Sequence, residues 1–187
     1  MRSDPHHNIH VITGKVQGGK TTFLAEMIER LTREEVKITG FLCPGSFHEG
    51  ERSGFTLVNP EDGRQIQLAT IQEKKEWLRF SRFYFNPDAF VQGETWIRHG
   101  LTQHPDLVVI DEVGPMELQG LGWNNVLKII EKRHDIAQIW IVREQILQDV
   151  KQRWNIHPDH IFRIDRTEHT ELFNNLYEKF KETIFNK

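Results

Sequence analysis

A glycine-rich segment that ends in lysine and threonine carries the clearest chemistry in the sequence. It fits the pattern G-x-x-x-x-G-K-[ST] and, with one residue added, consists of Gly14, Lys15, Val16, Gln17, Gly18, Gly19, Lys20, Thr21 and Thr22. Glycines let the backbone aim several N–H groups at one point, and a helix start adds its positive dipole end. The pattern therefore predicts a phosphate-binding loop, with Lys20 at the β- and γ-phosphates and Thr21 as a ligand of Mg²⁺. The alternative is a glycine-rich turn in which Lys-Thr occurs by chance.

Two residues of this segment admit more than one interpretation. Thr22 can donate to an α-phosphate oxygen. Lys15 is interpreted as an exposed loop charge or a local phosphate contact. In one class of P-loop ATPases a lysine at this offset reaches the nucleotide of a dimer partner, but that class has glycines where Val16 and Gln17 stand.

A second group of reactive side chains follows a hydrophobic run at residues 107–110, where Asp111 and Glu112 stand next to each other. Neighbouring parallel strands open onto one crevice at their carboxyl ends, so we expect Asp111 to hold Mg²⁺, directly or through water. Glu112 is then placed to orient or deprotonate a water that attacks the γ-phosphate. The alternative is that both carboxylates only cap the turn at Gly114 and Pro115.

The elements that must position these residues alternate along the chain. Short apolar runs predict strands at residues 9–13, 36–42, 107–110, 136–142 and 160–164. Apolar residues at helical spacing predict helices around residues 23–31, 87–103, 121–130, 146–154 and 172–184. Such alternation predicts an α/β fold of three layers, a mostly parallel sheet with helices on both faces, in one domain over residues 1–187.

Between these elements lies a segment of different character. Residues 54–58 and 65–71 alternate apolar with polar side chains around an Asn-Pro-Glu-Asp-Gly turn, which predicts a β-hairpin inserted on the sheet at about residues 54–71. Residues 74–86 are dense in charge and aromatic rings, and their pattern assigns no element. Their Phe80, Phe83, Tyr84 and Phe85 are interpreted as a loop edge packed on the core, with base stacking or a wall against a nucleobase as alternatives.

Composition excludes several classes of protein. A chain of 187 residues with 37% hydrophobic residues is large enough for one core and too apolar for disorder. A net charge of −3 argues against a nucleic-acid-binding field, and a single cysteine, Cys43, excludes an internal disulfide. No apolar run approaches the roughly 20 residues of a membrane span, and the first ten residues lack the apolar stretch of a signal peptide. We expect a soluble, cytoplasmic domain.

The sequence also resembles a known family. Residues 111–118, DEVGPMEL, are similar to the DEIGxMEL signature of the THEP1-type nucleoside-triphosphatases, and residues 49–55 resemble their E-x-x-R-x-G-F hairpin entry. The likeness covers about residues 9–145. It implies a RecA-like P-loop fold and slow, Mg²⁺-dependent hydrolysis of ATP, GTP and other nucleoside triphosphates. By position, residues 14–22 would bind phosphates, Asp111 the metal and Glu112 the water. Pro115 departs from the family, many of whose members have lysine there.

Three arginines and two other functions stay open at this point. Arg52 can reach a phosphate or a second substrate, or be an exposed turn charge. Arg143 can stabilise charge on the γ-phosphate, and Arg166 can flank the base, but a solvated residue is the favoured interpretation of both. A small-molecule or nucleotide kinase, or a nucleotide-dependent switch acting on a protein partner, would use the same loop. We expect weak base selectivity, because no motif for a base edge is visible.

Overall fold

A parallel sheet forms the centre of the molecule. The computed structural model describes residues 8–156, 160–164 and 169–185. Five strands pair in parallel in the order β10-β1-β9-β8-β2. Their bounds are β1 Ile9–Gly14, β2 Ile38–Phe41, β8 Leu107–Val113, β9 Ala137–Arg143 and β10 Ile161–Arg163. Strands β1 and β9 are apolar and buried nearly throughout, as expected of parallel strands covered on both sides.

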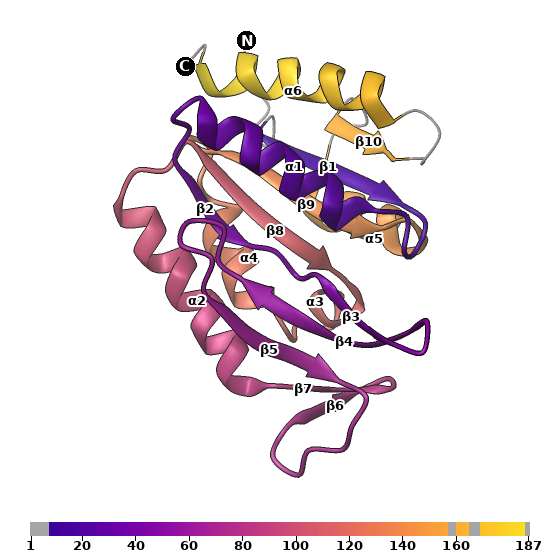
Figure 1. Ribbon diagram of the computed structural model, residues 1–187. Helices are drawn as coiled ribbons and strands as arrows, with labels where there is room; N and C mark the ends of the chain where they lie inside the picture. Colours follow the sequence, from indigo (N-terminus) through magenta and orange to yellow (C-terminus); the bar gives the residue numbers. More distant parts are fainter. Residues whose placement is uncertain (1–7, 157–159, 165–168, 186–187) are drawn as a thin grey trace.

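Helices cover both faces of this sheet (Figure 1). Along β8, Leu107 and Val109 pack into one hydrophobic cluster with α1 (Lys20–Arg33) and α6 (His169–Phe185). Their neighbours Val108 and Ile110 point to the other face and pack into a second cluster. That cluster contains residues of α2 Pro87–Thr102, α4 Asn124–Ile130 and α5 Leu147–Trp154. The period of two residues along the strand thus separates the two cores, and the predicted α/β layers are confirmed.

A glycine sets the distance between α2 and the edge strand β2. A Cβ atom on Gly100 would lie 1.9 Å from the Thr39 hydroxyl oxygen, far inside contact distance. Only a residue without a side chain lets the helix approach β2 this closely.

The predicted hairpin exists, but it belongs to a larger structure. Strands β4 and β5 pair as expected around the turn at Asn59. They lie within a second, antiparallel sheet of order β3-β4-β5-β7-β6. Its bounds are β3 Gly45–His48, β4 Glu51–Val58, β5 Gln65–Thr70, β6 Leu78–Phe80 and β7 Phe83–Phe85. The segment that sequence patterns left unassigned supplies β6 and β7, whose three residues each are too few to show a period.

The two sheets are joined by backbone and by core. Leu42, just beyond β2, exchanges both backbone hydrogen bonds with Val58 at the end of β4, at 2.9 and 2.8 Å. Phe55 and Leu57 of β4 belong to the same hydrophobic cluster as Val108 of β8. The second sheet is therefore fixed against the first.

The order of the strands could not be predicted from the sequence. Strand β9 lies between β1, which precedes the glycine-rich loop, and β8, which ends in the two carboxylates. The two motif strands are therefore not neighbours, because the chain returns to fill the gap after α4. Boundaries also move: the predicted strand at 36–42 shortens to β2, β8 continues to Val113, and a short helix α3 (Pro115–Leu118) precedes α4. No helix among the described residues combines the length and apolarity needed to cross a bilayer.

Candidate active site

The glycine-rich segment forms a loop between β1 and α1. Gln17 and Gly19 have positive φ angles of 59° and 86°, so both take the left-handed conformation before the helix begins. A Cβ on Gly14 would lie 2.7 Å from the backbone oxygen of Ile164, which leaves room only for glycine. Helix α1 follows Gly19 with no side chain capping its first amides, at least within the described residues. Uncapped amides at a helix start are donors suited to an anion.

Lys20 is the cation of this loop. Its Nζ donates to the backbone oxygens of Gly14 at 3.0 Å and Lys15 at 2.7 Å, and the residue is 7% exposed. Burial lowers the pKa of Lys20, and Arg143 and Arg52 lower it further, while Glu112 and Asp111 raise it. The Lys20 ammonium is thus held at the loop near both carboxylates and guanidinium groups. Lys15 itself is exposed.

Asp111 lies fully buried beneath the loop. Its Oδ2 accepts a hydrogen bond from the backbone N–H of Cys43 at 2.8 Å. Burial raises the pKa of Asp111 to about 7, and Glu112 adds to the rise. Hydrogen bonds from Cys43 and the Thr21 hydroxyl, together with Lys20, oppose it. The structure therefore brings Thr21 and Asp111 together although their strands are separated by β9.

The donor set fits a magnesium ion. Asp111 Oδ1 is buried and has no hydrogen-bond partner among the described residues, so an acceptor beside the Thr21 hydroxyl is left over. The part of the chain that the structure describes holds no cluster of three or more His, Cys, Asp or Glu side chains suited to a metal. An ion here would take its other ligands from phosphates and water, as Mg²⁺ commonly does.

Glu112 occupies a strained point of β8. Its φ is 70°, in the left-handed region that side chains avoid, and the pairing register of β8 with β9 shifts between Ile110 and Val113. The Oε2 of Glu112 accepts a hydrogen bond from Arg143 Nε at 3.0 Å and forms an ion pair with Arg143 Nη2 at 2.9 Å.

A cavity of about 610 Å³ lies above these groups. Its lining includes residues 16–22 of the loop, Glu112 and Arg143 from the strand ends, and Arg52, Phe55 and Phe83 from the second sheet. The volume is in the range of small-molecule sites. Four cations, Lys20, Arg52, Arg82 and Arg143, line the cavity beside one carboxylate, Glu112, so the site favours an anion.

Arg52 is placed in this cavity by its neighbours. Its guanidinium lies 5.2 Å from the Phe47 ring and 4.9 Å from that of Phe55. Gly45 makes the room, because a Cβ there would stand 2.8 Å from the guanidinium carbon. The Arg52 Nε is buried and has no hydrogen-bond partner among the described residues. Burial is also the main reason that the pKa of Arg52 is lowered.

The predicted residues thus fall into three groups. The structure gathers residues 16–22 of the loop and Glu112 at one cavity, together with two of the undecided arginines, Arg52 and Arg143, and it joins the buried Asp111 to Thr21. Arg166 lies outside the described residues.

Sequence reasoning missed two supports of the site. The first is the backbone N–H of Cys43, which donates to Asp111, and no pattern of side chains in the sequence indicates this contact. Glu117 stands in the DEVGPMEL segment, and there its carboxylate accepts from the N–H groups of Gly114 at 2.7 Å and Trp123 at 2.9 Å. Burial raises the pKa of Glu117 to about 7, against the effect of these two bonds.

Known proteins that are similar to this chain in sequence and in fold identify its family. Residues 9–177 match the model of the NTPase family. The nucleoside-triphosphatase THEP1 of Sulfolobus acidocaldarius is 31% identical over 130 residues, which are 68% of this chain and 73% of that protein. THEP1 of Methanopyrus kandleri is 28% identical over 183 residues, 95% of this chain and 97% of that protein. The crystal structure of THEP1 from Aquifex aeolicus superposes with a TM-score of 0.72 at 17% identity, covering 92% of this chain and 99% of that one. The chain therefore belongs to the NTPase family, alongside these THEP1 proteins.

Proposed function

We propose that this protein hydrolyses nucleoside triphosphates, ATP and GTP among them, to the diphosphate and phosphate with the help of Mg²⁺. One observation carries the proposal. Residues 16–22 of the phosphate loop and the carboxylate of Glu112 line a single cavity, and the buried Asp111 is hydrogen-bonded to Thr21 of that loop. The NTPase family membership and the name of the THEP1 relatives support the same reaction.

The phosphate tail would lie along the loop with its last phosphate toward Glu112. Backbone amides of residues 16–21 and the start of α1 bind the β- and γ-oxygens, and Lys20 neutralises their charge. Arg52 reaches the same cavity with a buried, unsatisfied Nε, and a phosphate oxygen is the acceptor that would satisfy it. Positive groups placed in advance stabilise the charge that spreads over the transferring phosphoryl group.

Thr21 and Asp111 are the residues that would hold the metal. A bound Mg²⁺ supplies charge neutralisation at the β- and γ-phosphate oxygens. In this chain the Cys43 amide holds the Asp111 carboxylate by donating to its Oδ2, and Oδ1 has no hydrogen-bond partner among the described residues. The fully buried position also excludes competing water from the carboxylate.

Glu112 would orient the attacking water and accept its proton. Its side chain lines the cavity, and the hydrogen bond and ion pair with Arg143 hold Oε2 in position. Oε1 is then the oxygen left to bind water. A positioned general base typically contributes about 10² to 10⁴ in rate.

We propose weak selectivity among bases, because the described lining of the cavity pairs phosphate-binding groups with the rings of Phe47, Phe55 and Phe83. The face of a phenylalanine ring can stack on any nucleobase. We also propose a cytoplasmic location, where nucleoside triphosphates are available.

The test is a phosphate-release screen of the purified protein with ATP, GTP, CTP and UTP, each with Mg²⁺ and with a chelator. We expect release from all four only when Mg²⁺ is present. No release from any of them, or release that is indifferent to chelation, would contradict the proposal.

A further inference from the structure

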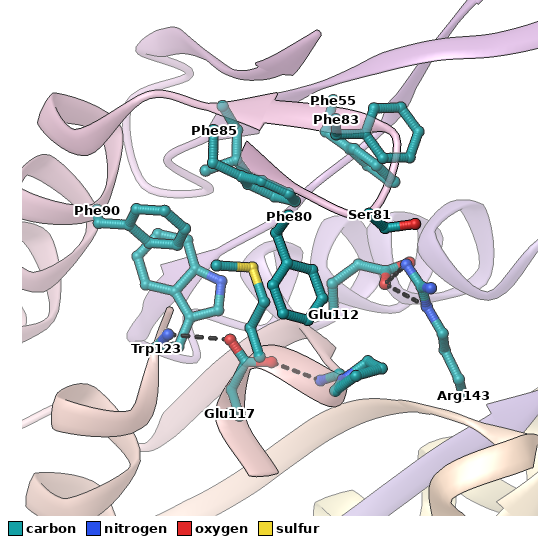
Figure 2. A pocket seen from close by; sticks show the side chains of 14 residues that line it. Phe55, Phe80, Ser81, Phe83, Phe85, Phe90, Glu112, Glu117, Trp123 and Arg143 are labelled. Carbon is teal, nitrogen blue, oxygen red and sulfur yellow. Dashed lines mark hydrogen bonds and ion pairs between the residues drawn. The ribbon is translucent and has the colours of Figure 1, made fainter. Parts of the chain in front are cut away.

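A second cavity adjoins the nucleotide cavity at Glu112 (Figure 2). Its volume is about 170 Å³. Six of its fourteen lining residues carry aromatic rings, namely Phe55, Phe80, Phe83, Phe85, Phe90 and Trp123. The rings brace one another: Phe90 meets Trp123 edge to face with centroids 4.7 Å apart, and Phe55 meets Phe83 in the same way at 5.3 Å. We call this space the aromatic pocket.

The aromatic pocket opens at the γ-phosphate end of the nucleotide cavity. The two spaces share five lining residues, Glu112, Arg143, Ser81, Phe55 and Phe83, but none of residues 14–22 lines the aromatic pocket. A nucleotide held by the loop would therefore direct its last phosphate toward the entrance of the pocket. A compound inside the pocket would face that phosphate across Glu112.

The polar groups of the pocket differ in what they can still bind. Glu117 lies in the wall, but both of its carboxylate oxygens are engaged by the N–H groups of Gly114 and Trp123 (Figure 2). This carboxyl ties α3 to the start of α4 and shapes the pocket. Glu112, whose Oε2 is bound to Arg143, and the Ser81 hydroxyl remain at the entrance as the groups able to meet a ligand.

Size and lining define the class of compound that fits. A cavity of about 150 Å³ lined by apolar side chains accommodates one benzene molecule, so this one holds a single six-membered ring with a small substituent. Aromatic walls favour a flat aromatic ring over an aliphatic one, through stacking and edge-to-face contacts. At the entrance, a carboxylate favours a substituent that donates a hydrogen bond.

We propose that the aromatic pocket binds a hydroxylated compound with one aromatic ring, and that its hydroxyl, placed at Glu112, accepts the γ-phosphoryl group. This proposal rests on nucleotide binding at the loop as set out above. The hydroxyl oxygen forms a bond to the γ-phosphorus while the bond from that phosphorus to the β,γ-bridging oxygen breaks. The nucleoside diphosphate leaves with the bonding electrons, and Glu112 takes the hydroxyl proton. When the pocket is empty, water takes the place of the hydroxyl.

Binding can be followed at one atom. The chain has three methionines, of which Met116 lines the aromatic pocket and Met27 lies buried on α1 in the other core cluster. Protein labelled with ¹³C at the methionine methyls is titrated with phenol and benzyl alcohol, for which ligands of this size suggest a Kd of about 1 mM. We expect saturable shifts of the Met116 signal, an unmoved Met27 signal, and weaker binding of cyclohexylmethanol. No Met116 shift with either aromatic probe would overturn the pocket, and equal binding of cyclohexylmethanol would overturn the ligand class.

Two variants locate the site. Phe80→Ala removes one ring from the wall and is expected to weaken probe binding by roughly fivefold, the effect of one ring contact. Leu78→Ala is the matched control, because Leu78 lies on the same short strand, is 43% exposed and does not line the pocket. Equal affinities in the two variants would contradict the assignment.

Transfer is tested separately by ³¹P NMR of the protein with Mg²⁺, ATP and each aromatic probe. We expect signals of phenyl or benzyl phosphate besides inorganic phosphate. Inorganic phosphate alone, with a Met116 shift, would overturn the acceptor role and leave a ligand pocket. Lys20→Ala should stop both reactions while the Met116 shift persists. No nucleotide turnover under any condition would instead refute the proposed hydrolase.

Discussion

The backbone conformation of Glu112 predicts that substitutions of this residue affect stability and activity in different ways. Its φ of 70° is a conformation that costs an L-residue about 1–2 kcal/mol, and glycine adopts it without that strain. In an ordinary strand, glycine is instead less stable than alanine by about 0.5–1 kcal/mol. Subtracting the second value from the first leaves a net preference of about 1 kcal/mol for glycine at this position.

We therefore expect Glu112→Gly to be more stable than Glu112→Ala by about 1 kcal/mol. Both variants lose the carboxylate and its ion pair with Arg143, so these losses cancel in the comparison. Both should also hydrolyse ATP about 10² to 10⁴ times more slowly than the wild type, as should Glu112→Gln, because each lacks the general base. Mg-ATP should still bind to Glu112→Gln, since the loop and Asp111 are intact.

The assay is urea unfolding of the variants, with single-turnover phosphate release measured on the same samples. Glu51, an exposed residue of β4 with an ordinary φ, supplies the control pair, in which the alanine variant should be the more stable one. The strain argument fails if alanine is as stable as glycine at position 112. Turnover at the wild-type rate in any of the three variants would remove Glu112 from the mechanism.

Three more expectations concern the loop and two buried groups. Lys20→Ala should abolish ATP binding measured by calorimetry, whereas the control Lys37→Ala, an exposed residue outside the cavity, should not; unchanged affinity in the first would refute the loop assignment. The pKa of Glu117 in the folded protein, about 7, exceeds the unfolded value of 4.5. The stability that its protonation contributes to the fold is therefore present below pH 4.5 and lost as the pH rises through 7. The free energy of unfolding of Glu117→Gln relative to wild type, measured in urea, should therefore rise by about 3 kcal/mol between pH 4.5 and 8.5. A difference between the two proteins that does not change with pH would contradict this. Burial lowers the pKa of His10 to about 3, with His160 and Lys179 adding to the shift, so its contribution is present above pH 6.5 and lost as the pH falls. Between pH 7.5 and 5, the free energy of unfolding of His10→Phe should fall by about 2 kcal/mol less than that of the wild type. An equal fall in both proteins would show that His10 does not titrate as its burial implies.

The phosphate loop and the acidic strand end could be predicted from the sequence because each is local. The turn from β1 into α1 depends on consecutive residues, above all Gly14 and Gly19, whose conformations only glycine takes easily. Asp111 and Glu112 follow a run that is buried on both faces, which fixes them at a strand end. The layered fold follows from the same kind of information, the alternation of apolar runs with helical stripes.

The rest of the candidate site depends on contacts between distant segments. The pairing of β6 with β7 and of β3 with β4 leaves no period in runs of three or four residues. The support that Cys43 gives to Asp111 comes from a backbone amide, which every residue except proline possesses. The insertion of β9 between the two motif strands is a property of the whole chain path. Arg52 could be proposed for the site, but only the packing of Gly45 and Phe55 around it places it there.

The two sheets contribute different parts of the site. The parallel sheet carries the phosphate loop and the buried carboxylate, while the antiparallel sheet supplies most of the rings around the aromatic pocket. A substitution of Phe80 on β6 can therefore change which compounds the aromatic pocket admits without touching the nucleotide cavity. The phosphate chemistry can then stay constant while the choice of acceptor changes, and Glu112 is among the side chains that line both cavities.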